Sequence, residues 1–192
     1  TTYFRGVVMF LCKRHIDIHA RFGVPRIAFL SIVTTIIAFL VSYEIMYYFV
    51  KTPLSVKYFL LLILFIILMY PIHKTIHLFF FLPYIHAFRW HKLNKKKWLP
   101  YFNTYVNTPV RKFYFCINLI LPFLIITSIL IFLTYHFPSY GHYFMFLLAL
   151  NLGLSVMDFL YLKIILFSKE GQFVEEHQTG INLLTKVPFH SN

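Results

Sequence analysis

Two histidines, four residues apart, lie inside an apolar stretch of this 192-residue chain. They are His73 and His77 of the segment Pro71–His77, and residues four apart on a helix share one face. Two imidazoles on one face can bind a single metal ion, as they do in zinc-binding helices. The spacing therefore predicts one part of a metal site within an apolar helix.

Lys74 stands where the H-E-x-x-H motif of zinc-dependent peptidases has glutamate. That glutamate accepts a proton from metal-bound water, and a charged ammonium group cannot do so. Three interpretations of Lys74 stay open. Its side chain extends to the membrane interface or pairs with a carboxylate, it attracts an anionic group beside the site, or it acts as a base after losing its proton. We predict no catalytic residue in this segment.

Asp158, in the last apolar stretch, is the predicted third ligand. From the expected outer ends of the two helices, His73 lies about 24 Å deep and Asp158 about 26 Å deep, at 1.5 Å per residue. His73, His77 and Asp158 thus reach a similar depth. Two imidazoles and a carboxylate form a zinc shell with one position left for water. Such sites also suit iron and other divalent metals, so we expect Zn²⁺ or another divalent ion.

A polar stripe accompanies Asp158, because Asn151, Ser155 and Asp158 follow one another at helical spacing. This stripe is expected to face the bundle interior. Asn151, Ser155 and Lys74 are therefore candidate polar neighbours of the site. The alternative for Asn151 and Ser155 is interhelical hydrogen bonding, with Gly153 allowing close approach.

Four apolar stretches must position these residues. They cover about residues 27–50, 57–82, 113–137 and 143–167, and each meets the ~20 residues that a membrane-spanning helix needs. The chain is 59% apolar and only 12% charged, unlike water-soluble domains. We predict an all-α polytopic membrane protein with four transmembrane helices, a basic cytosolic loop and a short cytosolic tail.

The cations flank these stretches asymmetrically. Among the 18 Lys and Arg residues, only Lys51 and Lys57 fall on the side of the two short links, and Lys74 lies within a span. Positive-inside reasoning places both termini in the cytosol, and we expect a bacterial cytoplasmic membrane. This distribution favours the lipid bilayer as partner and argues against nucleic acid. The expected organisation is an N-terminal segment 1–26, a four-helix domain 27–167 and a cytosolic tail 168–192.

Three shorter segments carry weaker predictions. Phe4–Phe22 mixes bulky apolar and basic residues, which is typical of an amphipathic helix on the inner leaflet or of a solvated basic leader. Tyr101–Val106 alternates weakly and is a candidate strand. Gly171–Thr185, with Gly180 inside it, is a candidate hairpin.

The whole arrangement resembles a bacterial family of membrane proteins of unknown function known as putative zincin peptidases. The resemblance covers about residues 60–184 and rests on His73–His77, Leu121-Pro122-Phe123, Asn151–Asp158, Gly171–Glu176 and Gly180-Ile181. A wider similarity is to site-2-type intramembrane metalloproteases, which place a histidine pair on one helix and an aspartate ligand two spans later. The resemblance implies His73, His77 and Asp158 as ligands. Lys74 in place of the catalytic glutamate, and the missing proline-containing sequence before the aspartate, depart from the pattern.

These observations lead to one expected function and two alternatives. We expect a zincin-like membrane protein with a degenerate His-Lys-Thr-Ile-His site, either a metal-binding pseudopeptidase or a protein that binds another membrane protein. The first alternative is an active intramembrane metallopeptidase with an unconventional base. The second is a metal-free lipid-interacting or transport-related protein. The sequence leaves open whether the chain is an enzyme, and metal analysis separates the second alternative from the others.

Overall fold

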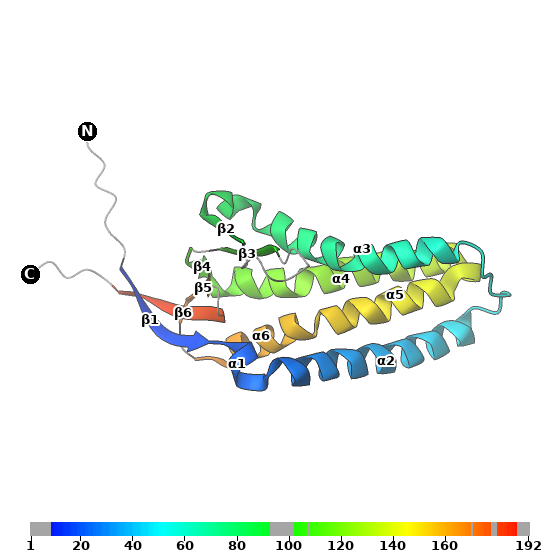
Figure 1. Ribbon diagram of the computed structural model, residues 1–192, viewed down its shortest axis with the longest axis horizontal. Coiled ribbons are helices and arrows are strands. Elements are labelled where there is room, and N and C mark those ends of the chain that lie inside the picture. The colour runs from blue at the N-terminus through cyan, green and yellow to red at the C-terminus, as the bar shows by residue number, and fades with distance from the viewer. Residues whose placement is uncertain (1–8, 93–101, 107, 170, 178–179, 188–192) are drawn as a thin grey trace, which may run out of the picture.

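A computed structural model describes residues 9–92, 102–106, 108–169, 171–177 and 180–187. Long helices run side by side along the molecule, and a small sheet closes one end (Figure 1). We call this end the sheet end. The opposite end, where residues 50–58 and 137–140 connect the helices, is the turn end. Lys95–Lys97 of the predicted basic loop lie outside the described residues.

Three of the helices are long and apolar enough to cross a membrane. They are α2 (Val24–Phe49), α3 (Phe59–Phe80) and α4 (Lys112–His136). The fourth predicted stretch is broken into α5 (Gly141–Leu154) and α6 (Val156–Phe167), which meet at an angle of 44°. The described part of the chain therefore holds three candidate spans, or four if the bent pair is a single span.

The break between α5 and α6 occurs at Ser155. The Ser155 hydroxyl donates to the carbonyl of Asn151 at 2.9 Å, and the Ser155 N–H donates to the same oxygen at 3.0 Å. Serines that bond back to the carbonyl four residues earlier often bend helices. The last apolar stretch changes direction at this residue, just before Asp158.

The helices pack in the order α2, α5, α4 and α3 across the molecule (Figure 1). α2 lies along α5 and α6, and α3 lies along α4 and α5. Large apolar side chains are exposed along both flanking helices, and only 6% of the α2 window and 11% of the α3 window are buried, against 33% for α4. Such outer surfaces suit a lipid environment, where the internally bonded backbone of a helix is also stable.

Gly153 explains how closely α2 approaches α5. A Cβ atom at this position would collide with Thr35 Oγ1 and lie 3.1 Å from the carbonyl of Ser31. Small residues at such crossings let helix backbones come together. The contact fixes α5, and with it the bend that leads to Asp158.

The sheet end holds four antiparallel strands in the order β1-β6-β5-β4. These are β1 (Met9–Ile16), β4 (Val110–Arg111), β5 (Phe173–His177) and β6 (Gly180–Val187). A separate pair is formed by β2 (Phe88–Lys92) and β3 (Phe102–Val106). Two short 3-10 helices, η1 (Leu82–Ala87) and η2 (Pro138–Tyr140), complete the elements.

The small sheet confirms two predictions and corrects two others. β5 and β6 form the predicted hairpin, and β3 is the predicted strand. The all-α prediction was too simple, because the chain is mostly helical with a small sheet. Neither alternative for Phe4–Phe22, an amphipathic helix or a solvated leader, holds over Met9–Ile16, which is strand β1; within the described part of the segment, α1 (Ile18–Phe22) is helical. Residues 9–16 pair with β6 instead, and this pairing satisfies their backbone groups.

The buried residues form two groups. At the sheet end, Ile18, Val110, Ile165, Val174 and Leu183 belong to one cluster that joins the sheet to the helices. Toward the turn end, Met69, Ile126, Leu130 and Leu147 form a cluster within the bundle. The polar residues singled out in the sequence come from α3, α5 and α6, next to these apolar clusters.

Candidate metal centre

The site is built from one face of α3 and the first turn of α6. His73 and His77 stand on consecutive turns of α3, with ring centroids 5.1 Å apart. Asp158 lies three residues after the break at Ser155, so the bend sets the direction in which its carboxylate points. The structure therefore brings together the three side chains that the sequence predicted as ligands.

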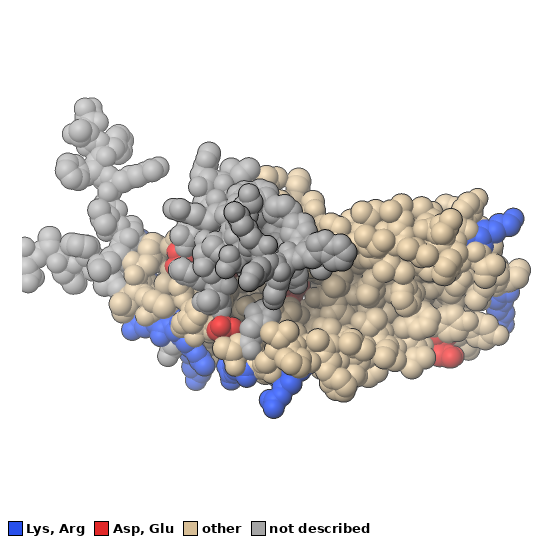
Figure 2. Space-filling model, in the orientation of Figure 1, with Lys and Arg blue, Asp and Glu red and all other residues tan. Residues whose placement is uncertain are grey.

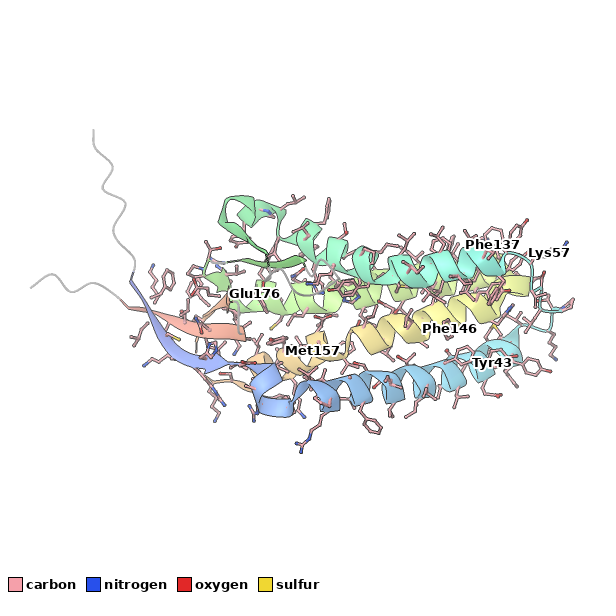
Figure 3. The ribbon with its side chains drawn as sticks, viewed as in Figure 1. Tyr43, Lys57, Phe137, Phe146, Met157 and Glu176 are labelled. Atoms are coloured by element: carbon pink, nitrogen blue, oxygen red, sulfur yellow. The ribbon has the colours of Figure 1, made fainter. Side chains whose placement is uncertain are left out.

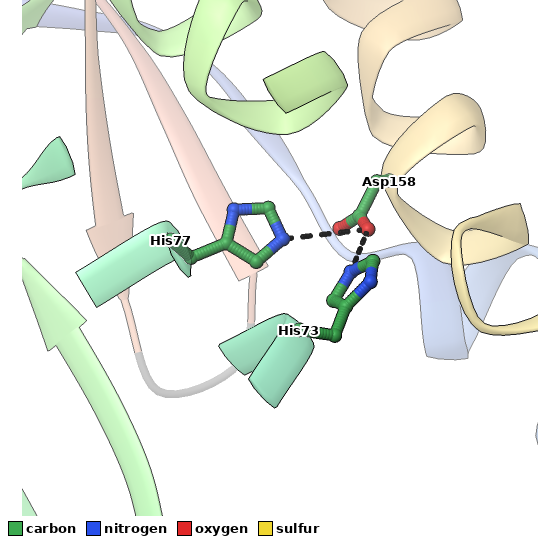
Figure 4. A group of neighbouring side chains, drawn as sticks. All are labelled: His73, His77 and Asp158. Atoms are coloured by element: carbon green, nitrogen blue, oxygen red, sulfur yellow. Dashed lines mark hydrogen bonds and ion pairs between the residues drawn. The ribbon is translucent and has the colours of Figure 1, made fainter. Parts of the chain in front are cut away.

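Both imidazoles point at the same carboxylate oxygen (Figure 4). The Nε2 atom of His73 lies 3.0 Å from Asp158 Oδ2, and the Nε2 atom of His77 lies 3.4 Å from it. One ligand atom from each residue falls within 4.8 Å of the others. Within the described residues, this is the group of histidine, cysteine and acidic side chains with the spacing of a metal site.

These distances fit a tetrahedral metal shell. Zinc binds imidazole nitrogen and carboxylate oxygen at about 2.0–2.2 Å, so two ligand atoms in a tetrahedral shell lie about 3.3 Å apart. The two measured nitrogen-to-oxygen distances, 3.0 and 3.4 Å, bracket that value. Three protein ligands leave a fourth position, as in zinc sites that bind water or another molecule.

The centre is buried on one side and partly open on the other. The His73 side chain is 7% exposed, whereas those of His77 and Asp158 are 18% and 17% exposed. A charged carboxylate at this burial is costly without a positive partner. The open side at His77 and Asp158 is where a further molecule can reach the centre.

Asn151 orients His73 from the other side of its ring. Asn151 Oδ1 lies 3.1 Å from His73 Nδ1. The amide has a defined orientation, because its Nδ2 donates to the carbonyl of Phe123 and to Thr127 Oγ1, at 3.4 Å each. A carbonyl can only accept, so Asn151 Oδ1 is left to accept the Nδ1–H of His73.

The contact between His73 and Asp158 needs a metal ion or a proton between its two atoms. With its Nδ1–H donated to Asn151, His73 directs the lone pair of Nε2 at Asp158 Oδ2, another acceptor. Two acceptors 3.0 Å apart repel unless a metal ion, or a proton on either group, lies between them. A divalent metal accepts both lone pairs, and metal-bound histidines usually donate their other N–H to an outer partner, as His73 does to Asn151.

For the two remaining predicted neighbours, Ser155 and Lys74, the structure shows no side-chain hydrogen bond or ion pair to His73, His77 or Asp158. The hydroxyl of Ser155 is fully buried and bonds to the backbone of Asn151, so its part is to shape the bend. Lys74 is partly exposed, and the structure shows no ion pair between it and a carboxylate among the described residues. One helical residue separates Lys74 from His73 by about 100°, which turns it away from the face of the histidine pair.

The carbonyl of Phe123 and the hydroxyl of Thr127 were not predicted from the sequence. They hold the amide of Asn151 and thereby connect α4 to the centre. Thr127 carries a weak signal, a polar side chain within an apolar stretch. The carbonyl of Phe123 carries none, because every residue has one.

Comparison with known proteins gives one match. The sequence profile of a family described as "Putative zincin peptidase" matches residues 66–173, a range that includes His73, His77 and Asp158. No curated protein and no solved structure matches the chain. The match covers more than half of the 192 residues. The chain therefore belongs to the family described as "Putative zincin peptidase".

Proposed function

We propose that this chain is an integral membrane protein that holds a divalent metal ion, Zn²⁺ first among the candidates, and that it has lost peptidase activity. His73 and His77 on α3 and Asp158 on α6 are the proposed ligands. The observation that carries the proposal is the convergence of two imidazoles on one carboxylate oxygen, at 3.0 and 3.4 Å. Bound at this position, a zinc ion would act as a Lewis acid and would acidify a bound water.

The loss of peptidase activity follows from Lys74. In H-E-x-x-H peptidases the residue at this position accepts the proton of the metal-bound water. An ammonium group has no lone pair to accept it. The metal therefore has a different use in this chain: it links α3 to α6, and another membrane protein binds on the open side of the centre.

The membrane placement rests on the helices and on the charges around them. α2, α3 and α4 are long and apolar enough to span, and the visible middle of the molecule carries no Lys or Arg (Figure 2). Cations gather at the sheet end, and Lys57 marks the turn end (Figure 3). We propose four spans with the sheet end and both termini in the cytoplasm of a bacterial cell. Labelling of single cysteines by a membrane-impermeant reagent tests this orientation.

Elemental analysis tests the metal. The full chain is purified in detergent without chelator, together with Asp158→Ala. About one zinc or other divalent ion per chain in the wild type, and a loss of most of it in Asp158→Ala, supports the proposal. A wild type without any divalent metal would favour the metal-free lipid-interacting or transport-related protein instead.

A variant that restores the motif tests the missing base. Lys74→Glu produces H-E-x-x-H on the same helix. Cleavage of a membrane-anchored reporter by Lys74→Glu, with none by the wild type, supports a metal site that lacks only its proton acceptor. Cleavage by the wild type shows instead an active peptidase, and its loss in Lys74→Ala identifies the lysine as the unconventional base.

One observation favours a second candidate, a metallohydrolase whose base comes from the sheet. Side chains two residues apart on a strand point to the same face of the sheet. Glu176 is two residues after the fully buried Val174 on β5, so it faces the bundle side of the sheet. Tyr161, one turn after Asp158 on α6, packs against the same buried cluster as Val174. If the wild type cleaves the reporter and Glu176→Gln abolishes cleavage while metal content is kept, this candidate replaces the first.

A further inference from the structure

A surface pocket lies at the sheet end, where β1 turns into α1 just before the first long helix. It measures about 480 Å³ and is lined by Arg14, His15, Ile16, Asp17, Ala20 and Arg21. Its volume falls in the range of small-ligand sites, about 300–1,000 Å³. The neighbouring surface is also basic, and Figure 2 shows Lys and Arg gathered at this end of the molecule.

The charge in the pocket is mainly positive and is not neutralised. Arg14 and Arg21 are both exposed, and neither forms an ion pair with a described carboxylate. The only acid in the lining, Asp17, accepts the Ala20 N–H at its Oδ1, 3.0 Å away. One oxygen of Asp17 is therefore used in the turn into α1, and two guanidinium groups against one carboxylate leave the lining with a net positive charge.

The fold holds this pocket in place. His15 Nδ1 lies 2.7 Å from Asn182 Oδ1 on β6, which fixes the end of β1. The guanidinium of Arg21 stands 5.7 Å from the ring centre of Phe22, a cation–π contact that keeps it beside the chain. Ile16 and Ile18 are buried in the cluster at the sheet end and anchor the turn between them.

The position of the pocket relative to the bilayer indicates the ligand. Arg21 is three residues before α2, the candidate span that begins at Val24. Helical residues rise about 1.5 Å each, so the pocket lies in the headgroup layer if α2 crosses the membrane. Phosphates of phospholipids lie in that layer, and planar guanidinium groups bind phosphate through paired hydrogen bonds.

We propose that this pocket binds the phosphate of an anionic phospholipid through Arg14 and Arg21. The site is separate from the metal centre. It depends on the proposed membrane placement of α2 and not on metal binding. A lipid held here fixes the sheet to the membrane surface at the base of α2.

Native mass spectrometry of the detergent-purified full chain tests the site. The probes are phosphatidylglycerol, phosphatidylcholine and inorganic phosphate at equal concentration. The variant is Arg14→Gln with Arg21→Gln. The matched control is Lys51→Gln with Lys57→Gln, which removes the same charge at the turn end. We expect the wild type and the control to retain phosphatidylglycerol, and the arginine variant to lose at least about tenfold in affinity, the size of about one charge-assisted hydrogen bond.

Each other result contradicts the proposal. Equal losses in the variant and the control show attraction to net charge without a site. If phosphatidylcholine is retained as well as phosphatidylglycerol, the pocket does not distinguish an anionic headgroup from a neutral one. If inorganic phosphate binds in place of lipid, the pocket is a site for free phosphate. If the glutamine variant does not fold, Arg14→Lys with Arg21→Lys keeps the charge but removes the paired hydrogen bonds, and unchanged lipid affinity then overturns the proposal. Zinc content is measured in the same samples. Loss of lipid binding with zinc retained is a property of the pocket, and loss of zinc with lipid binding retained is a property of the metal centre.

Discussion

The two ends of the helical bundle hold their helices together by different interactions. Near the sheet end, the apolar cluster is supplemented by polar side chains that join α3, α4, α5 and α6: His73 contacts Asp158 and Asn151, and Asn151 contacts the backbone of Phe123. Near the turn end the contacts are apolar and aromatic, as in the pairs Phe39–Phe146 and Tyr140–Tyr143. The short links also bond to each other there, from Ser55 N–H to the carbonyl of Ser139 at 2.9 Å.

This difference separates two kinds of constraint. Apolar contacts tolerate exchange of similar residues, because their energy depends mainly on shape and buried area. Buried polar contacts fail when one partner is removed, because the other is left unsatisfied in a medium of low polarity. The polar end should therefore respond sharply to single substitutions and to metal removal, and the turn end should respond weakly. Four predictions test this contrast.

The largest effect is expected for Asp158→Ala. It removes the carboxylate that both imidazoles contact, which is also a proposed metal ligand, and leaves the two imidazoles without their acidic partner. Breaking a buried charged pair costs about 3–5 kcal/mol, so we expect a loss of metal and a large fall in the free energy of unfolding. Elemental analysis and thermal melting in detergent measure both quantities.

The control for this prediction is Glu44→Gln, which removes an acid from α2 near the turn end and should change neither metal content nor stability. Chelator should lower the melting temperature of the wild type and leave that of Asp158→Ala unchanged. His73→Ala should lose the metal, as Asp158→Ala does. If one of these two variants loses the ion and the other retains it, the three-residue centre is wrong.

A smaller effect on metal binding is expected for Asn151→Ala. The variant keeps all three ligands but removes the acceptor of the His73 Nδ1–H. Loss of such an outer hydrogen bond lowers metal affinity about 10–100-fold, which competition with a chelator measures. The matched variant is Thr134→Val near the turn end; the Thr134 hydroxyl donates to the carbonyl of Leu130 in its own helix. Equal affinities in the two variants would contradict the role given to Asn151.

Glycine substitutions compare the packing of the two ends. Gly153→Ala would place a methyl group against Thr35 and the backbone carbonyl of Ser31, where the backbone cannot move away cheaply. We expect a destabilisation of about 1–3 kcal/mol. Gly141→Ala near the turn end meets the flexible Met46 side chain instead, so a smaller effect is expected. Thermal melting of the two variants should rank them in this order; the reverse order would show that the α2–α5 crossing at Gly153 is not closely packed.

The smallest effect is expected for Lys74→Ala. Lys74 is partly exposed and makes no ion pair with a described carboxylate, so its removal should change stability by no more than about 0.5 kcal/mol. Metal content should stay the same. A fall in metal content, measured by elemental analysis, would show that Lys74 supports the centre and would add a further residue to the polar contacts of this end.

Much of the site could be predicted because its signals lie within one helix or follow from counting residues along the chain. The histidine pair needed only the helical period, and the depth of Asp158 needed only the rise per residue along two apolar stretches. The polar stripe identified Asn151, although not its partner. Its hydrogen bond to His73 joins residues 78 positions apart, and no periodicity within either helix indicates it.

The fold prediction failed where distant segments decide the structure. Met9–Ile16 pairs with β6 at the far end of the chain, with Met9 opposite Val187. A mixed apolar and basic segment is compatible with either a helix or a strand, and the presence of an open strand edge decides between them. The break at Ser155 likewise depends on whether its hydroxyl bonds to its own helix or to a neighbour.

By itself the sequence determined the approximate lengths of the first three apolar helices, the asymmetry of the cations, the shared face of His73 and His77, and the lysine in the glutamate position. Each of these depends on neighbours within a few turns or on composition. Only the tertiary structure decided that one oxygen of Asp158 faces both imidazoles, that Asn151 orients His73, and that β1 joins the sheet. These features depend on contacts between segments that are far apart in the sequence. Such contacts stabilise the protein only once the chain has folded and brought the segments together.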